Sequence, residues 1–185
     1  MRTLVLLLAV STACAQAADP APSTTTPAAT PPPAQPSTPA ATSAIGHCAA
    51  DETAFFDCDV GKGKRLSVCA NEGSMQYRFG KIGAPELVFP EQAKDGAQHF
   101  TIEERAHVRS SGNVLSFHNA DVRYEVTSMI GGGCCSDEEA AANNFVGVYV
   151  FKKDTYDILA TVGCRGEGTD RLGELIGKVP APKSE

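Results

Sequence analysis

The sequence predicts an all-β fold, an antiparallel sandwich or barrel of about 8–9 strands with a short C-terminal helix, behind a disordered N-terminal tether. Apolar and polar residues alternate in short segments, which is the period of a strand with one buried face. Gly, Asn, Asp and Pro separate these segments, as they do in turns. Six cysteines follow the first 45 residues, an even number that is typical of exported domains held by disulfides.

The first residues have the three parts of an export signal. Met1 begins a short positive start, Leu4–Val10 is an apolar core, and Ala15-Gln16-Ala17 is a small-x-small cleavage site. We therefore predict a signal peptide over residues 1–17. An alternative is a lipoprotein processing site with Cys14 as the candidate lipidation site, although Ser11 stands where such sites usually carry Leu. Both alternatives predict an exported protein, periplasmic or secreted in the first case and membrane-tethered in the second.

Residues 18–45 are predicted to form a disordered linker rich in Ala, Pro, Thr and Ser. Eight prolines fall among the 27 residues from Asp19 to Ile45, and the segment cannot bury a core. With polyproline geometry its reach is about 80 Å. One interpretation is a spacer that carries the domain away from a membrane or through a crowded envelope. The other is a linker with no role beyond solubility.

The folded domain is predicted over residues 46–185, and its first half contains four strand signals. Phe55–Val60 precedes a Gly-Lys-Gly-Lys turn. Leu66–Ala70 and Met75–Phe79 then alternate with period two. Leu87–Phe89 is short and stops at a proline, which cannot donate to a strand ladder.

Five more segments follow in the second half. Phe100–Val108 is ambiguous between strand and helix. Val114–His118 and Val122–Ile130 flank an Asn-Ala-Asp turn, and Phe145–Phe151 and Tyr156–Val162 flank a Lys-Lys-Asp turn.

The chain is expected to close with one short helix. Leu172, Leu175 and Ile176 would share one helical face, and Thr169 or Asp170 would cap its N-terminus. This helix would cover one end of the β structure.

Charge and motif content argue against several classes of function. The chain has 22 acidic and 16 basic residues and a formal charge of −6, whereas a nucleic-acid binder normally presents a basic face. No apolar run after the first 20 residues is long enough to span a bilayer. The serines lack a nucleophile elbow and the glycines lack a phosphate-loop pattern, so we predict no enzyme and no cofactor.

The cysteines are expected to form disulfides and not a zinc site, because no Cys-x-x-Cys pair is present. The six are Cys48, Cys58, Cys69, Cys134, Cys135 and Cys164. They permit 15 pairings, among which the sequence does not decide. Our expectation joins Cys48 to Cys58 and Cys69 to Cys164.

Cys134 and Cys135 are adjacent, after three glycines and before an acidic run. One interpretation is a redox or metal-sensing loop, since a disulfide between neighbours is strained and easily reduced. The other is an inert staple, or separate partners elsewhere. Acidic neighbours disfavour a reactive thiolate, which favours the inert alternative.

Two groups of side chains are candidates for ligand contact. His99, Glu103 and His107 would share a helical face and hold zinc together with His118, but on a strand they would spread over about 26 Å. Because the surroundings favour strands, we predict no metal site. We also expect partner contacts from two groups of basic residues. One is a cluster at the first predicted turn, Lys62, Lys64 and Arg65, and the other is Arg78, which stands between two aromatic residues.

The segment from Cys48 to Gly80 resembles a group of small exported proteobacterial proteins of unassigned function. The resemblance rests on Cys48-Ala-Ala-Asp-Glu-Thr-Ala-Phe-Phe-Asp-Cys58, Leu66-Ser-Val-Cys69 and Gln76-Tyr-Arg-Phe-Gly80. Asn113–Phe117, Tyr124 and the closing Cys164 fit the same group. The resemblance implies an exported β protein with four framework cysteines and no catalytic residues. Cys134 and Cys135 are an addition to that pattern.

The function expected from the sequence is binding of a protein partner in the bacterial envelope. A concrete form is inhibition of a basic enzyme such as a lysozyme, which an acidic domain would attract. Two alternatives stay open: a redox or metal-handling protein that uses Cys134 and Cys135, and an envelope structural lipoprotein in which the linker matters most.

Overall fold

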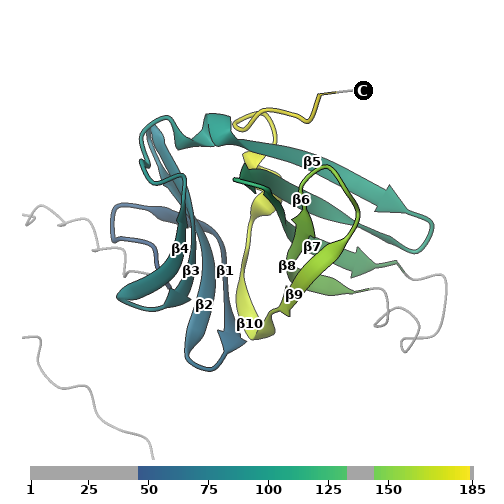
Figure 1. The fold of residues 1–185 in the computed structure, drawn as a ribbon, viewed down its shortest axis with the longest axis horizontal. Coiled ribbons are helices and arrows are strands. Elements are labelled where there is room, and N and C mark those ends of the chain that lie inside the picture. Colours follow the sequence, from purple (N-terminus) through teal and green to yellow (C-terminus); the bar gives the residue numbers. More distant parts are fainter. Residues whose placement is uncertain (1–45, 133–143, 184–185) are drawn as a thin grey trace, which may run out of the picture. The chain divides into compact units, whose positions relative to one another are not determined.

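The fold is all-β, as predicted. The structure, a computed structural model, describes residues 46–132 and 144–183. In that part, ten strands form two five-stranded antiparallel sheets (Figure 1). The predicted signal peptide and linker, the candidate lipidation site Cys14, and Cys134 and Cys135 lie outside the described residues.

The first sheet has the strand order β10-β1-β2-β3-β4, and hairpins join β1 through β4. Its strands are β1 (Thr53–Gly61), β2 (Lys64–Asn71), β3 (Ser74–Lys81), β4 (Ala84–Phe89) and β10 (Arg165–Asp170). The three hairpin turns fall at the Gly-containing segments between the alternating runs, as the pattern predicts.

The second sheet has the order β5-β6-β7-β8-β9 and is also a run of antiparallel neighbours. Its strands are β5 (Phe100–His107), β6 (Ser110–Asn119), β7 (Val122–Gly131), β8 (Phe145–Lys152) and β9 (Ile158–Gly163). The ambiguous segment at Phe100–Val108 is therefore a strand. Residues spaced by four along β5 are spread along it and do not converge.

The chain passes from the second sheet to the first between β9 and β10. β9 ends at Gly163, and β10 begins at Arg165 and pairs with β1 (Figure 1). The sequence of β10 has no apolar residue, so its alternation carries no signal and the strand was not predicted. This strand raises the number in the described part above the 8–9 expected.

The inner faces of the two sheets meet in one hydrophobic core. Tyr77 of β3 contacts Phe117 of β6 with ring centroids 5.0 Å apart, and Phe117 stacks on Tyr124 of β7 at 4.8 Å. Leu66 and Val68 of β2 are fully buried beside them. The sheets are thus held together as a sandwich by side chains that alternate inward with period two.

The expected C-terminal helix is one turn of 3₁₀-helix, η2 (Leu172–Leu175); a second such turn, η1 (Gly96–His99), precedes β5. Leu172 and Leu175 are buried as predicted, but Ile176 is 51% exposed and the predicted cap residues belong to β10. Glycines at 173 and 177 disfavour a longer helix, which explains the difference.

Within the described ranges, no helix is long and apolar enough to cross a membrane.

Candidate functional site

Arg78, a predicted contact residue, holds the segment that precedes β1. Its guanidinium donates to both carboxylate oxygens of Glu52, at 2.5 and 2.7 Å, and to the carbonyl oxygen of His47 at 2.8 Å. Burial alone would raise the pKa of Glu52. Hydrogen bonds from Arg78 and the Ala49 amide, with the charge of Arg78, outweigh burial and lower that pKa below its usual range.

Two of the other predicted contact residues also have partners inside the domain. Arg65 pairs with Asp57, a carboxylate that is 1% exposed and also accepts a hydrogen bond from Ser67 Oγ at 2.6 Å. Lys64 pairs with Glu86 at 2.8 Å. Lys62 stands exposed on the β1–β2 turn. Partner contact at these residues stays a prediction, and Arg65 and Arg78 have structural roles that the sequence did not reveal.

The expected disulfide pairing was wrong, because the four described cysteines pair differently. Cys48 joins Cys69, and Cys58 joins Cys164. Cys58 faces the core, whereas Cys69 packs with Cys48 and Ala54 on the outer face of the first sheet. Successive side chains of a strand point to opposite faces of the sheet. Cys58 lies opposite Leu66 in the β1–β2 register, and Cys69 is three residues beyond Leu66, so Cys58 and Cys69 lie on opposite faces.

Neither group of potential metal ligands forms a metal site in the described part of the chain. Cys48, Glu52 and Cys69 lie close together, but the two sulfurs are joined to each other. His99 precedes β5 and His107 ends it, so their helical arrangement with Glu103 does not form.

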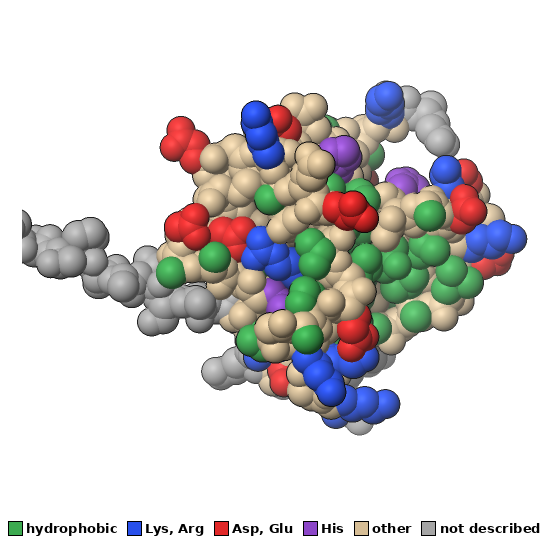
Figure 2. Space-filling view, turned by 60° about the vertical axis from the view of Figure 1, so that its left-hand side comes forward, with side chains coloured by type: hydrophobic (Ala, Val, Ile, Leu, Met, Phe, Trp, Pro, Cys, Tyr) green, Lys and Arg blue, Asp and Glu red, His purple; other side chains and the backbone are tan. Residues whose placement is uncertain are grey.

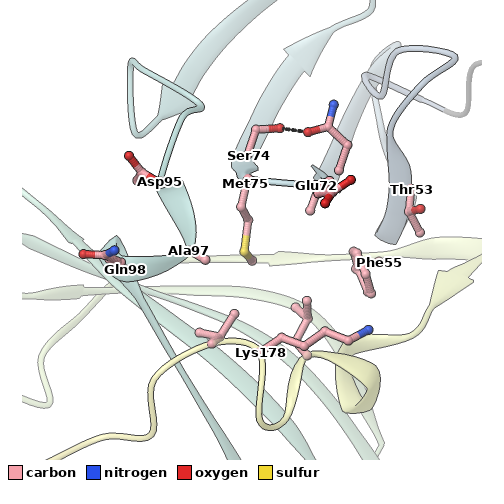
Figure 3. A pocket seen from close by; sticks show the side chains of 14 residues that line it. Thr53, Phe55, Glu72, Ser74, Met75, Asp95, Ala97, Gln98 and Lys178 are labelled. Carbon is pink, nitrogen blue, oxygen red and sulfur yellow. Dashed lines mark hydrogen bonds between the residues drawn. The ribbon is translucent and has the colours of Figure 1, made fainter.

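A cavity of about 530 Å³ opens at one end of the sandwich, and we take it as the candidate site (Figure 3). It lies where the start of β1, the β2–β3 turn, η1 and the segment after η2 come together. Backbone hydrogen bonds hold these parts in place: the Met75 amide donates to Ala93, and the Asp95 amide donates to Gly73, both at 2.9 Å. Its volume lies in the range of ligand pockets, about 300–1,000 Å³.

The floor of this end pocket is apolar. Phe55 of β1 and Met75 of β3 are buried and line it together with Ala97 of η1. Leu175 and Val179, both buried, close the side formed by the C-terminal segment. These side chains offer contact to hydrocarbon but no hydrogen-bond partner.

The rim of the end pocket is polar and carries two carboxylates. Glu72 lies on the β2–β3 turn and Asp95 just before η1, so both carboxylates stand above the apolar floor (Figure 3). Ser74 donates to Asn71 between them. Among the described residues, no cation lies within ion-pair distance of Glu72 or Asp95.

Two cationic side chains of the protein itself lie over the aromatic ring in the floor of the end pocket. Lys178 Nζ lies 5.3 Å from the centroid of the Phe55 ring, and the Arg171 guanidinium carbon lies 5.7 Å from it. Arg171 is also paired with Glu174, whereas Lys178 has no ion pair in the described part. Aromatic faces attract cations in this way. The end pocket therefore combines aromatic, aliphatic and anionic surface around one lysine.

A second polar hollow lies on the outer face of the second sheet. Arg105 and Arg123 flank the buried carboxylate of Glu125, and Arg105 also pairs with Glu103. Arg123 is held over the rings of Phe151 and Tyr156. The arginines and glutamates here form ion pairs with one another. The hollow therefore has less unpaired charge for a ligand than the end pocket has.

The sequence did not indicate Glu72, Asp95 or Lys178 as site residues. Glu72 lies in a predicted turn, where a charged residue is ordinary. Asp95 and Lys178 are distant from it in sequence and reach the same pocket through the packing of η1 and η2 on the sandwich.

No family model matches the chain, and neither the curated proteins nor the solved structures contain a match to it. The resemblance to exported proteobacterial proteins stays a prediction.

Proposed function

We propose that this protein is an exported binding module of the bacterial envelope, and that its end pocket receives a basic side chain of a protein partner. The proposal rests on one observation: the end pocket has an apolar floor and, above it, two carboxylates that lack cationic partners in the described part of the chain. A Lys or Arg stem would pack on Phe55 and Met75, and its charge would reach Glu72 and Asp95.

Three further properties support this proposal. The formal charge of −6 would attract a basic partner over a distance. Two disulfides are typical of a protein in an oxidising compartment such as the periplasm. Lys178 over the Phe55 ring shows a cationic side chain in the kind of contact that a partner would make. A basic enzyme such as a lysozyme meets these requirements.

A double variant tests the rim carboxylates. Glu72→Gln with Asp95→Asn should weaken binding and inhibition of a basic lysozyme about tenfold, from two exposed charge contacts of roughly 0.7 kcal/mol each. Lys178→Gln should strengthen binding, because it removes the cation that competes for the same surface. Affinity measured by calorimetry at low salt gives the readout, and added salt should lower it.

The control is Glu104→Gln with Asp157→Asn, which removes the same charge from an exposed position on β5 and an exposed position just before β9. This control should bind nearly as well as the wild type. Equal loss in both double variants would mean that net charge alone acts, and a panel of lysozymes with undiminished activity would reject the proposal.

A further inference from the structure

A second cavity, of about 310 Å³, opens between the two sheets, and its lining is almost entirely apolar. Phe79 and Leu87 line it from the first sheet, and Val148, Ala160 and Val162 line it from the second. Its mouth lies between β4 and β9, which are the edge strands of their sheets among the described residues. We call this cavity the slot.

Other apolar side chains, which are not part of the lining of the slot, are exposed on β9 and on the turn before β4. In the β9 strand Ile158 is 57% exposed and Leu159 is 58% exposed, and Ile82 on the β3–β4 turn is 55% exposed. Figure 2 shows hydrophobic side chains gathered in one area of the visible face, with Lys and Arg side chains gathered at its lower end. The visible face of the molecule thus has an apolar area with basic side chains at one end.

Two lysines continue the inner face of the first sheet beyond the residues that line the slot. Lys64 and Lys81 are directly opposite each other in the β2–β3 register. By the period of two, they continue the inward rows that contain Leu66 and Phe79. Two like charges at opposed positions repel each other. The row that lines the slot thus ends in a pair of lysines.

One lysine is tied to the slot by direct contacts. Lys64 Nζ lies 5.7 Å from the centroid of the Phe79 ring and 2.8 Å from Glu86, and both Phe79 and Glu86 line the slot. Lys81 is exposed and has no carboxylate within ion-pair distance in the described ranges. The strands next to the slot therefore carry Lys64, which contacts two lining residues, and Lys81, which lies opposite Lys64 in the register.

We propose that the slot binds a single-chain anionic amphiphile, a fatty acid. Its acyl chain would lie against Phe79, Val148 and Ala160 between the sheets. Its carboxylate would lie between Lys64 and Lys81 and relieve their repulsion. The cavity is at the small end of the range for ligand pockets, so it takes one chain and not the two of a phospholipid. This site is separate from the end pocket.

Titration of the mature protein with dodecanoate, below its micelle concentration, tests the proposal. We expect one dodecanoate per chain, with dodecanol at least fivefold weaker and dodecyltrimethylammonium weaker still. Ala160→Phe, which fills the slot, should weaken dodecanoate binding at least tenfold. Thr161→Phe, on the opposite face of the same strand, should leave it unchanged. Equal binding of the cationic amphiphile, or equal effects of the two Phe variants, would overturn the proposal.

The charged end is tested separately, by variants that leave the slot open. Lys81→Gln should weaken dodecanoate binding about fivefold, whereas Lys94→Gln, near the other end of β3, should have no effect. Glu86→Gln should strengthen binding, because it frees Lys64. Binding that ignores both lysine variants would overturn the proposal. A second result would also overturn it: no dodecanoate binding, together with equal binding of the wild type and Ala160→Phe to vesicles of anionic phospholipid. The lysines would then bind a membrane surface.

Discussion

Glu52 and Arg78 join the segment before β1 to the outer face of the first sheet. The side chains are 6% and 16% exposed, and the guanidinium meets the carboxylate with two hydrogen bonds. In the same segment, Gly46 approaches Asp57 closely: a Cβ atom on residue 46 would lie 1.7 Å from a carboxylate oxygen of Asp57. The position where the predicted linker joins the domain is therefore held by specific contacts.

Acid should weaken this attachment. The folded-state pKa of Glu52 is lowered, so its contribution is fully present above the unfolded value of 4.5 and is lost as pH falls through the folded value. Glu52→Gln should lower the free energy of unfolding by about 2 kcal/mol at pH 7. In denaturant titrations the gap between variant and wild type should narrow toward pH 3. A gap that is the same at both pH values would contradict the role of the charge.

At the residue scale, the sequence predicted which side chains are buried better than what the polar ones do. Leu66, Val68 and Tyr77 are core residues, as their period of two predicts. Arg65 and Arg78 were expected to contact a partner. Their carboxylate partners Asp57 and Glu52 lie 8 and 26 residues away, and the hydrophobic pattern has no information about such pairs.

Strands lie where the sequence predicts them when apolar and polar residues alternate. β2, β3, β6 and β7 lie over the predicted segments, with ends that differ by a few residues. β10 consists of Arg, Gly, Glu, Gly, Thr and Asp, and it is a strand because β1 offers it an edge. Tertiary pairing, not local preference, makes this element.

The two disulfides fix elements to different extents. Cys48–Cys69 closes a separation of 21 residues and holds the segment before β1, whereas Cys58–Cys164 closes 106 residues and ties β1 to the chain between β9 and β10. In the chain-entropy model these loops contribute about 3 and about 5 kcal/mol. Cys58→Ser with Cys164→Ser should therefore lower the melting temperature more than Cys48→Ser with Cys69→Ser does.

A tryptic digest without reductant checks the pairing itself. Cys48 and Cys58 lie in one peptide, since no Lys or Arg stands between them, and cleavage after Arg65 separates that peptide from Cys69. The observed pairing predicts three peptides joined together, with Cys48 and Cys58 linked to those of Cys69 and Cys164. An internally closed Cys48–Cys58 peptide would contradict it.

At the scale of the described domain, two cavities of the sandwich carry the proposed binding sites. The end pocket lies where η1 and η2 cover one end, and the slot lies between the edge strands β4 and β9. The all-β class was predictable from periodicity and turns. Neither opening was, because each is formed by segments that are distant in sequence and meet only when the two sheets pack.

We propose above that the end pocket is the surface that meets a basic protein partner. Hydrogen exchange of the protein, with and without a basic lysozyme, tests this proposal. We expect slower exchange at the β2–β3 turn from Asn71 to Met75 and at Asp95–Gln98, with little change in β9. Protection confined to the second sheet, or no protection at saturating lysozyme, would contradict the claim.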